Sequence, residues 1–201
     1  AWNATPAANG SGQTIAIVDS GINASNTELA SRISADSKDF ALQAGQQRDA
    51  NDQYDHHGTT VALLAAAARD GSGVMGIAPQ ANILALRVDR KNSCTSSCDF
   101  SETRIADAIS YAASKAVTVI NLSIRGGSSL SAVNTAVSNA AAQDVVIVIA
   151  AGNDGNANPS ALVTGVLAAG TAHVIVAGSV DATGTLSTFS DRAGSTQNSY
   201  L

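Results

Sequence analysis

The stretch Thr14-Ile15-Ala16-Ile17-Val18, followed at once by Asp19, decides the fold of this chain. Isoleucine, valine and threonine are β-branched residues that favour strands. Polar side chains do not alternate with the apolar ones, which is typical of a strand buried on both faces of a parallel sheet. We therefore expect a buried strand over residues 14–18 that ends at Asp19.

Similar apolar runs recur along the chain and alternate with helix-like segments. Further strands are predicted over residues 83–88, 117–120, 145–149 and 174–177. Helices are predicted over residues 59–68, 99–115 and 130–140, and Asp99 and Glu102 have the spacing of a capping box at the start of the second helix. This alternation predicts an α/β fold with a mostly parallel sheet and helices on both faces. No repeat or linker divides residues 1–201, so we expect one domain.

The composition limits the classes of protein to which the chain can belong. Of its 201 residues, 45% are hydrophobic and only 13% are charged, which suits a folded core and excludes a disordered chain. The formal net charge is −5, and the 11 lysines and arginines form no basic block, so nucleic acid is not an expected partner. No apolar run approaches the roughly 20 residues of a transmembrane segment.

Polar side chains follow several of the predicted strands. Asp19, Asn121 and Asn153 each come just after a strand-like run. Parallel sheets of this kind bind ligands at the carboxyl ends of their strands. We therefore expect these three residues to gather at that edge of the sheet.

Three segments resemble, in chain order, the Asp, His and oxyanion-Asn motifs of the subtilisin-like serine proteases. They are Ile17-Val18-Asp19-Ser20-Gly21, His57-Gly58-Thr59-Thr60-Val61-Ala62 and Ala150-Ala151-Gly152-Asn153. The resemblance covers nearly the whole chain and implies peptide-bond hydrolysis. In that family the nucleophilic serine follows later, in a Gly-Thr-Ser-x-Ala-type stretch that residues 1–201 lack. We therefore expect an incomplete catalytic domain, without its C-terminal part and inactive alone.

The resemblance assigns catalytic roles to Asp19, His57 and Asn153. A serine hydroxyl is a weak nucleophile near neutral pH and needs an adjacent base. His57 would accept the hydroxyl proton and later pass it to the leaving amine, while Asp19 would fix the imidazole tautomer. Asn153 would donate its side-chain amide to the developing oxyanion. His56 competes for the role of the base, but it precedes the motif by one residue and is expected at the surface.

The same resemblance predicts two sets of substrate contacts. One set, Ser123, Ile124 and Arg125, falls where the family pairs an extended peptide with an exposed strand. Arg125 replaces a usual glycine, so it either favours acidic side chains or is simply solvated. The other set forms a wall and mouth of the specificity pocket: Ala150, Ala151, Gly152 and Asp154. Asp154 either attracts Lys and Arg side chains or braces a glycine-rich turn.

Cysteines and carboxylates suggest further features. Cys94 and Cys98 enclose three polar residues, and a small-loop disulfide is favoured over free thiols or a metal site. A disulfide indicates an oxidising compartment, so we expect a secreted or cell-surface protein. The chemistry requires no cofactor. Structural calcium is implied by the family, with Asp70 and Glu28 near the matching places, but two carboxylates do not fill a calcium shell and no metal ligand is assigned.

Two functions from different classes remain. The first is a secreted endopeptidase acting on protein or peptide substrates, with a companion C-terminal fragment or a propeptide as partner. The second is a catalytically silent module that binds peptides or a partner. Residues 71–76 match the dinucleotide fingerprint, but they follow a predicted helix instead of a strand, so nucleotide binding is rejected.

Overall fold

A parallel sheet forms the centre of the molecule in the computed structural model, which describes residues 8–40, 56–90, 93, 98–126, 128 and 130–201. Its strands are β1 (Thr14–Asp19), β2 (Lys38–Asp39), β3 (Asn82–Arg87), β4 (Val119–Leu122), β5 (Val146–Ala150) and β6 (Val174–Ala177). Their order is β2-β3-β1-β4-β5-β6, and every pairing between them is parallel. The predicted fold class is confirmed.

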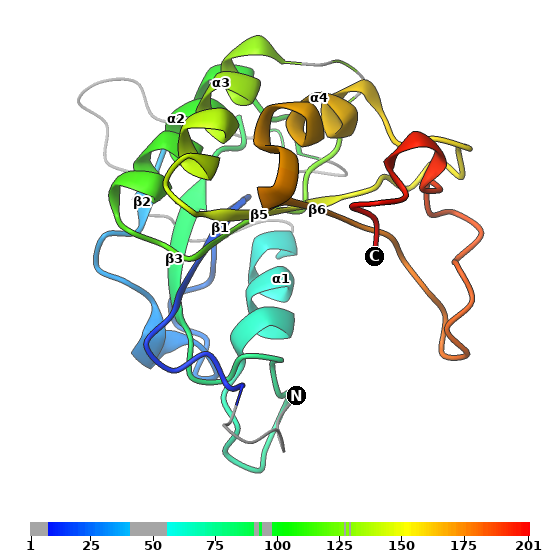
Figure 1. The fold of residues 1–201 in the computed structure, drawn as a ribbon. Helices are drawn as coiled ribbons and strands as arrows, with labels where there is room; N and C mark the ends of the chain where they lie inside the picture. Colours follow the sequence, from blue (N-terminus) through cyan, green and yellow to red (C-terminus); the bar gives the residue numbers. More distant parts are fainter. Residues whose placement is uncertain (1–7, 41–55, 91–92, 94–97, 127, 129) are drawn as a thin grey trace.

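Helices cover both faces of this sheet (Figure 1). They are α1 (His57–Ala66), α2 (Glu102–Ser114), α3 (Ser131–Ala141) and α4 (Ala161–Gly170). Figure 1 shows α2, α3 and α4 side by side on one face and α1 on the other. Short 3-10 turns occur at Ala30–Arg32, Thr171–His173 and Gly194–Thr196.

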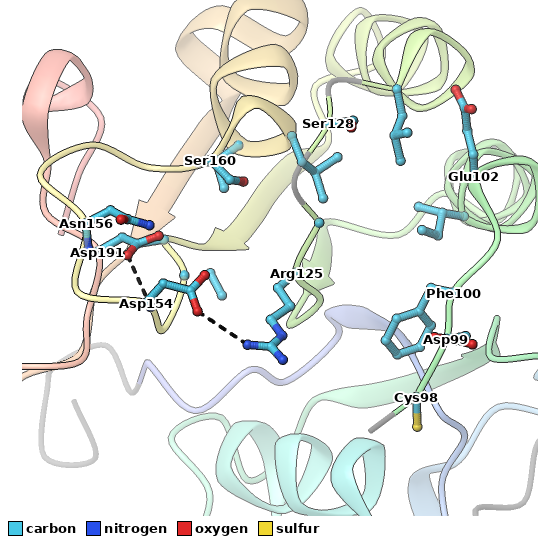
Figure 2. Close-up of a pocket in the computed structure, with 18 residues that line it drawn as sticks. Cys98, Asp99, Phe100, Glu102, Arg125, Ser128, Asp154, Asn156, Ser160 and Asp191 are labelled. Atoms are coloured by element: carbon cyan, nitrogen blue, oxygen red, sulfur yellow. Dashed lines mark hydrogen bonds and ion pairs between the residues drawn. The ribbon is translucent and has the colours of Figure 1, made fainter. Parts of the chain in front are cut away.

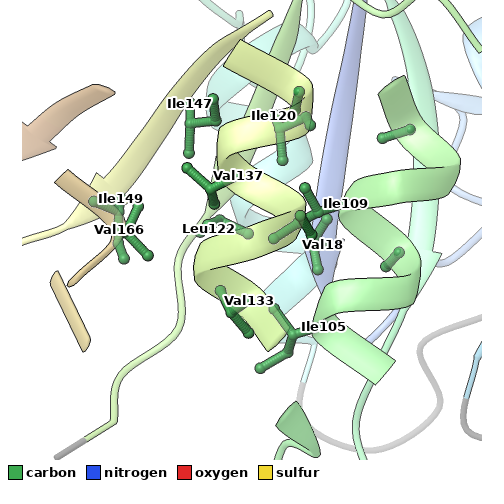
Figure 3. Close-up of a cluster of buried hydrophobic side chains, with 14 of the residues drawn as sticks. Val18, Ile105, Ile109, Ile120, Leu122, Val133, Val137, Ile147, Ile149 and Val166 are labelled. Atoms are coloured by element: carbon green, nitrogen blue, oxygen red, sulfur yellow. The ribbon is translucent and has the colours of Figure 1, made fainter. Parts of the chain in front are cut away.

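The larger core lies between the sheet and the three-helix layer (Figure 3). Alternate residues of the strands point into it, among them Val18, Ile120 and Ile149. Helices α2 and α3 contribute Ile109 and Val137 from their inner faces. This layer holds the central strands at a fixed register, and so fixes the positions of the residues at their carboxyl ends.

The smaller core lies under α1 and involves mainly β1 and β3. Ile17, Ile83 and Ala66 belong to it and are fully or almost fully buried. The guanidinium of Arg32 lies at the end of α1, where it donates to the carbonyl of Ala66. It also donates to the carbonyls of Glu28 and Pro79. Desolvation of this guanidinium lowers the pKa of Arg32, and the nearby Glu28 carboxylate opposes that shift.

Strands β4, β5 and β6 are less covered on the α1 side of the sheet. Val119, Val146, Val148 and Ile175 are only half-buried, whereas their neighbours on the other face are buried. These residues lie on the same face of the sheet as Ile15 of β1, because the register pairs Ile15 with Val119, Val119 with Val146, and Val148 with Ile175. The contacts of helix α1 with the sheet are mainly with β1 and β3.

The capping box predicted for Asp99 and Glu102 is wrong. Helix α2 begins at Glu102 with Ser101 as its N-cap residue, and Ser101 makes no side-chain capping bond. The carbonyl of Asp99 instead accepts the backbone N–H of Arg90. Glu102 caps a different helix, because its Oε1 accepts the N–H of Ala132 in the first turn of α3 at 3.0 Å. The sequence analysis also missed α4 and the short strand β2.

Candidate active site

The last residue of β1 contacts the first residue of α1. Oδ1 of Asp19 lies 2.8 Å from Nδ1 of His57. Asp19 is fully buried, while the side chain of His57 is 50% exposed. A carboxylate can only accept a hydrogen bond, so Nδ1 carries the proton and Nε2 is the basic nitrogen of the neutral ring. The pair has the geometry of a base and the group that orients it.

The backbone around this pair is held by short polar contacts. The N–H of Ser20 also donates to Oδ1 of Asp19, at 2.7 Å. The N–H of Gly58 donates to the hydroxyl of Ser20 at 3.1 Å. A Cβ on Gly58 would lie 2.2 Å from the carbonyl oxygen of Gly21, so only glycine lets α1 start this close to β1.

His56 occupies a different position from His57. It is exposed and stands as the N-cap residue of α1 in the left-handed conformation, with φ of 56°. Its carbonyl accepts the N–H and the hydroxyl of Thr60, both at 2.9 Å. Among the described residues, the histidine in contact with Asp19 is therefore His57.

A pocket opens at the carboxyl ends of β4 and β5 (Figure 2). Its lining includes Arg125 and Gly126 after β4, and Ala150, Ala151, Gly152 and Asp154 at the end of β5. The guanidinium of Arg125 lies 3.6 Å from the carboxylate of Asp154, with both side chains more than half exposed. The structure thus brings together the predicted wall residues and joins the two charges that the sequence analysis treated separately.

Ser123, Ile124 and Asn153 lie outside that lining, as do Asp19 and His57. Ser123 is half-buried and accepts a hydrogen bond from Nδ2 of Asn121 at 2.9 Å. Ile124 is 3% exposed and belongs to the larger core, so only its backbone can meet a peptide. Asn153 is exposed, in the loop between β5 and α4. The sequence analysis expected Asn121 just after a strand, but it is a residue of β4 itself.

Asp191 also lines the pocket and was missed by the sequence analysis. It is 1% exposed, and its Oδ1 accepts the N–H groups of Asp154 and Asn156. The motif segments gave no signal for it, because the contact joins residues 35 and 37 positions apart. Cys98, Asp99 and Phe100 line the opposite side of the pocket (Figure 2). Cys94 lies outside the described residues, so the Cys94–Cys98 disulfide stays a prediction.

Glu28 and the loop after α1 offer oxygen atoms for a cation. Oε2 of Glu28 is buried and has no hydrogen-bond partner within the described part of the chain. The loop backbone comes close to this carboxylate, since a Cβ on Gly73 would lie 2.4 Å from Oε1. Asp70 is exposed and accepts the N–H of Ser72 within its own turn. No group of three or more His, Cys, Asp or Glu side chains that could hold a metal occurs among the residues described.

Comparison with known proteins identifies the family of this arrangement. The profile of the Subtilase family matches residues 10–199. The chain belongs to the subtilase family. Thermitase of Thermoactinomyces vulgaris is 39% identical over 155 residues, which are 76% of this chain and 52% of thermitase. The major intracellular serine protease of Bacillus subtilis is 32% identical over 177 residues, 88% of this chain and 54% of that protein.

Two solved structures share the fold. Sphericase superposes with a TM-score of 0.74 at 28% identity, covering 91% of this chain and 60% of its own. The S41 psychrophilic protease gives the same TM-score and identity, with coverages of 92% and 60%. The chain thus spans about half the length of the curated subtilases that it matches. None of the helices described here has the length and hydropathy needed to span a lipid bilayer.

Proposed function

We propose that this chain is the N-terminal part of a serine endopeptidase domain whose nucleophilic serine lies beyond residue 201. The observation that carries the proposal is the 2.8 Å contact between Asp19 and His57 at the carboxyl edge of the sheet. Buried Asp19 fixes the orientation of a half-exposed base. Membership of the subtilase family supports the same reaction class.

In the complete site, Nε2 of His57 takes the proton of the serine hydroxyl as its oxygen attacks the scissile carbonyl carbon. The carbonyl oxygen gains the negative charge, and the side-chain amide of Asn153 donates to it. The C–N bond then breaks, and His57 returns the proton to the leaving amine. Water, deprotonated by the same histidine, hydrolyses the acyl-enzyme ester and restores the serine.

The half-covered face of β4, β5 and β6 supports a companion segment. Val146, Val148 and Ile175 on that face are only half-buried, and α1 packs mainly on β1 and β3. Covering apolar side chains of this kind contributes roughly 25 cal/mol per Å². The proposed segment after residue 201 packs on this face and brings the serine towards His57.

The proposed substrates are proteins or peptides, bound in extended form along the backbone of Ser123, Ile124 and Arg125. The proposed location is outside the cytoplasm, because a Cys94–Cys98 disulfide would need an oxidising compartment. Structural calcium is proposed at Glu28, whose unpartnered Oε2 is a suitable hard ligand, with loop carbonyls completing the shell. No metal takes part in the proposed chemistry.

Active-site labelling tests the proposed function. The full-length protein should react with a fluorophosphonate probe and cleave a casein substrate, and His57→Ala should lose both reactions. Residues 1–201 produced alone should not be labelled. If the full-length protein bound peptides but showed neither labelling nor turnover, the chain would belong to a catalytically silent binding module instead. Stoichiometric labelling of residues 1–201 would place the nucleophile inside the chain.

A further inference from the structure

The carboxylate of Asp191 holds the loop that carries Asn153 (Figure 2). Its Oδ1 accepts the N–H of Asn156 at 2.8 Å and that of Asp154 at 3.2 Å. The backbone N–H of Asp191 donates to the carbonyl of Gly152 at 3.0 Å. One residue therefore fixes the peptide groups on both sides of Asn153.

Gly152 lets this carboxylate approach. Its φ of +121° is a conformation that residues with a side chain rarely adopt, and a Cβ there would lie 2.2 Å from Oδ2 of Asp191. Two more backbone hydrogen bonds join the same segments. The N–H of Gly155 donates to the carbonyl of Phe189 at 2.7 Å, and the N–H of Arg192 donates to the carbonyl of Asn156 at 2.9 Å. The loop from residue 152 to 156 is thus fastened along segment 189–192.

Because Asp191 is buried, its carboxylate depends on the hydrogen bonds that it accepts from the loop. The residue is 1% exposed, and no lysine, arginine or histidine of the described residues forms an ion pair with it. Burying a carboxylate is unfavourable unless hydrogen bonds compensate it. Here the compensation comes from the loop amides, and such charge-assisted bonds are about twice as strong as neutral ones. The hydroxyl of Tyr200 in turn holds the carbonyl of Asp191 at 2.5 Å.

We propose that Asp191 is a positioning residue that acts through Asn153. An oxyanion donor is effective only at about 2.7–3.1 Å from the charged oxygen, so small movements of its loop reduce its effect. Asn153 itself is exposed. Asp191 keeps the side-chain amide where charge develops. This inference rests on the proposed peptidase function.

A double-mutant cycle in the full-length protein tests the inference. Asp191→Ala should lower kcat by about 10- to 100-fold, below the roughly 10²–10³ that a whole oxyanion donor contributes. KM should stay within about threefold, because the proposed interaction strengthens in the transition state. Asp191→Asn, which keeps an acceptor oxygen, should recover most of the loss. In an Asn153→Ala background, Asp191→Ala should cost less than about threefold, since the donor it positions is already gone.

Fluorophosphonate titration counts folded sites, so that kcat refers to competent enzyme only. Asp191→Ser is the second variant in case Asp191→Ala does not fold, because its shorter side chain cannot bridge both amides. Thr196→Ala is the control: this buried residue donates its hydroxyl to the carbonyl of Ala193 within its own turn. A loss of equal size in both Asn153 backgrounds, or a rise in KM that matches the fall in kcat, would overturn the inference. Wild-type protein without turnover would instead refute the proposed function, before any Asp191 variant is compared.

Discussion

The guanidinium of Arg125 and the carboxylate of Asp154 face one another at 3.6 Å across the mouth of the pocket. They come from the loops after β4 and β5, so the parallel pairing of those strands brings the two charges together. The sequence alone suggested opposite substrate preferences for the two residues. Paired, each largely cancels the field of the other towards a substrate side chain.

Removing either charge should reveal the preference of the other. Asp154→Asn should raise kcat/KM for peptides with Glu before the scissile bond, and Arg125→Gln should raise it for peptides with Lys. Solvent screens the exposed pair, so we expect changes of about 1 kcal/mol, or roughly fivefold, relative to a matched Leu peptide. Unchanged Lys-to-Leu and Glu-to-Leu ratios in both variants would show that the pair does not select substrates.

The two adjacent histidines should differ sharply in their effect on turnover. His57→Ala should lower kcat of the full-length protein by at least about 10⁴-fold, because it removes the proton acceptor that Asp19 orients. His56→Asn should leave kcat within a few-fold, since asparagine tolerates the left-handed backbone there. The measurement is steady-state peptide hydrolysis per folded molecule. Equal losses would mean that the base has been assigned wrongly.

Calcium should stabilise the protein through Glu28. At a calcium concentration 100 times the dissociation constant, binding to the native state contributes about 2.7 kcal/mol. Thermal unfolding in calcium and in chelator should therefore differ for wild type, and the difference should vanish in Glu28→Gln. Asp70→Asn is the control, because Asp70 bonds within its own exposed turn. A calcium effect that survives Glu28→Gln would place the ion elsewhere.

The two cysteines should be found as a disulfide. Intact mass under non-reducing conditions should be two hydrogens lower than the reduced mass, and iodoacetamide should not modify the native protein. The closed loop is small, so its reduction should cost no more than the ~2–4 kcal/mol typical of longer loops. Two alkylated cysteines in freshly purified protein would contradict the pairing.

Glu102 should stabilise α3 rather than its own helix. Its Oε1 accepts the N–H of Ala132, so Glu102→Ala should lower the free energy of unfolding by about 0.5–2 kcal/mol. Asp99→Ala should have a smaller effect, since α2 begins without a side-chain cap from it. Urea titration of both variants distinguishes the two. A larger loss of unfolding free energy from Asp99→Ala would mean that Asp99 caps α2 after all.

The sequence predicted those features that depend on neighbouring residues. The apolar runs located five of the six described strands, and the local motifs singled out Asp19 and His57, which lie in contact in the structure. Helix α4 was missed because Ala161–Gly170 is apolar nearly all round and shows no stripe. Strand β2 was too short, at two residues, to give a pattern.

Contacts between distant segments could not be predicted in this way. Glu102 has the spacing of a local cap, and only the packing of α2 beside α3 directs it to Ala132. Asp191 is an ordinary loop residue in the sequence, and only the folded chain places it against Gly152 and Asp154. In both cases the partner is chosen by tertiary packing, which a single sequence does not record.

The central place of β1 in the sheet has a consequence for the order in which the protein folds. β1 is the first of the described strands along the chain, yet its neighbours β3 and β4 come much later. Asp19 is therefore enclosed only after synthesis has passed Leu122 and both long-range pairings have formed, a slow kind of step. A slip of one residue in either pairing would turn its carboxylate to the opposite face. A nascent chain consequently does not enclose the Asp19–His57 pair until β4 has been made and has paired with β1.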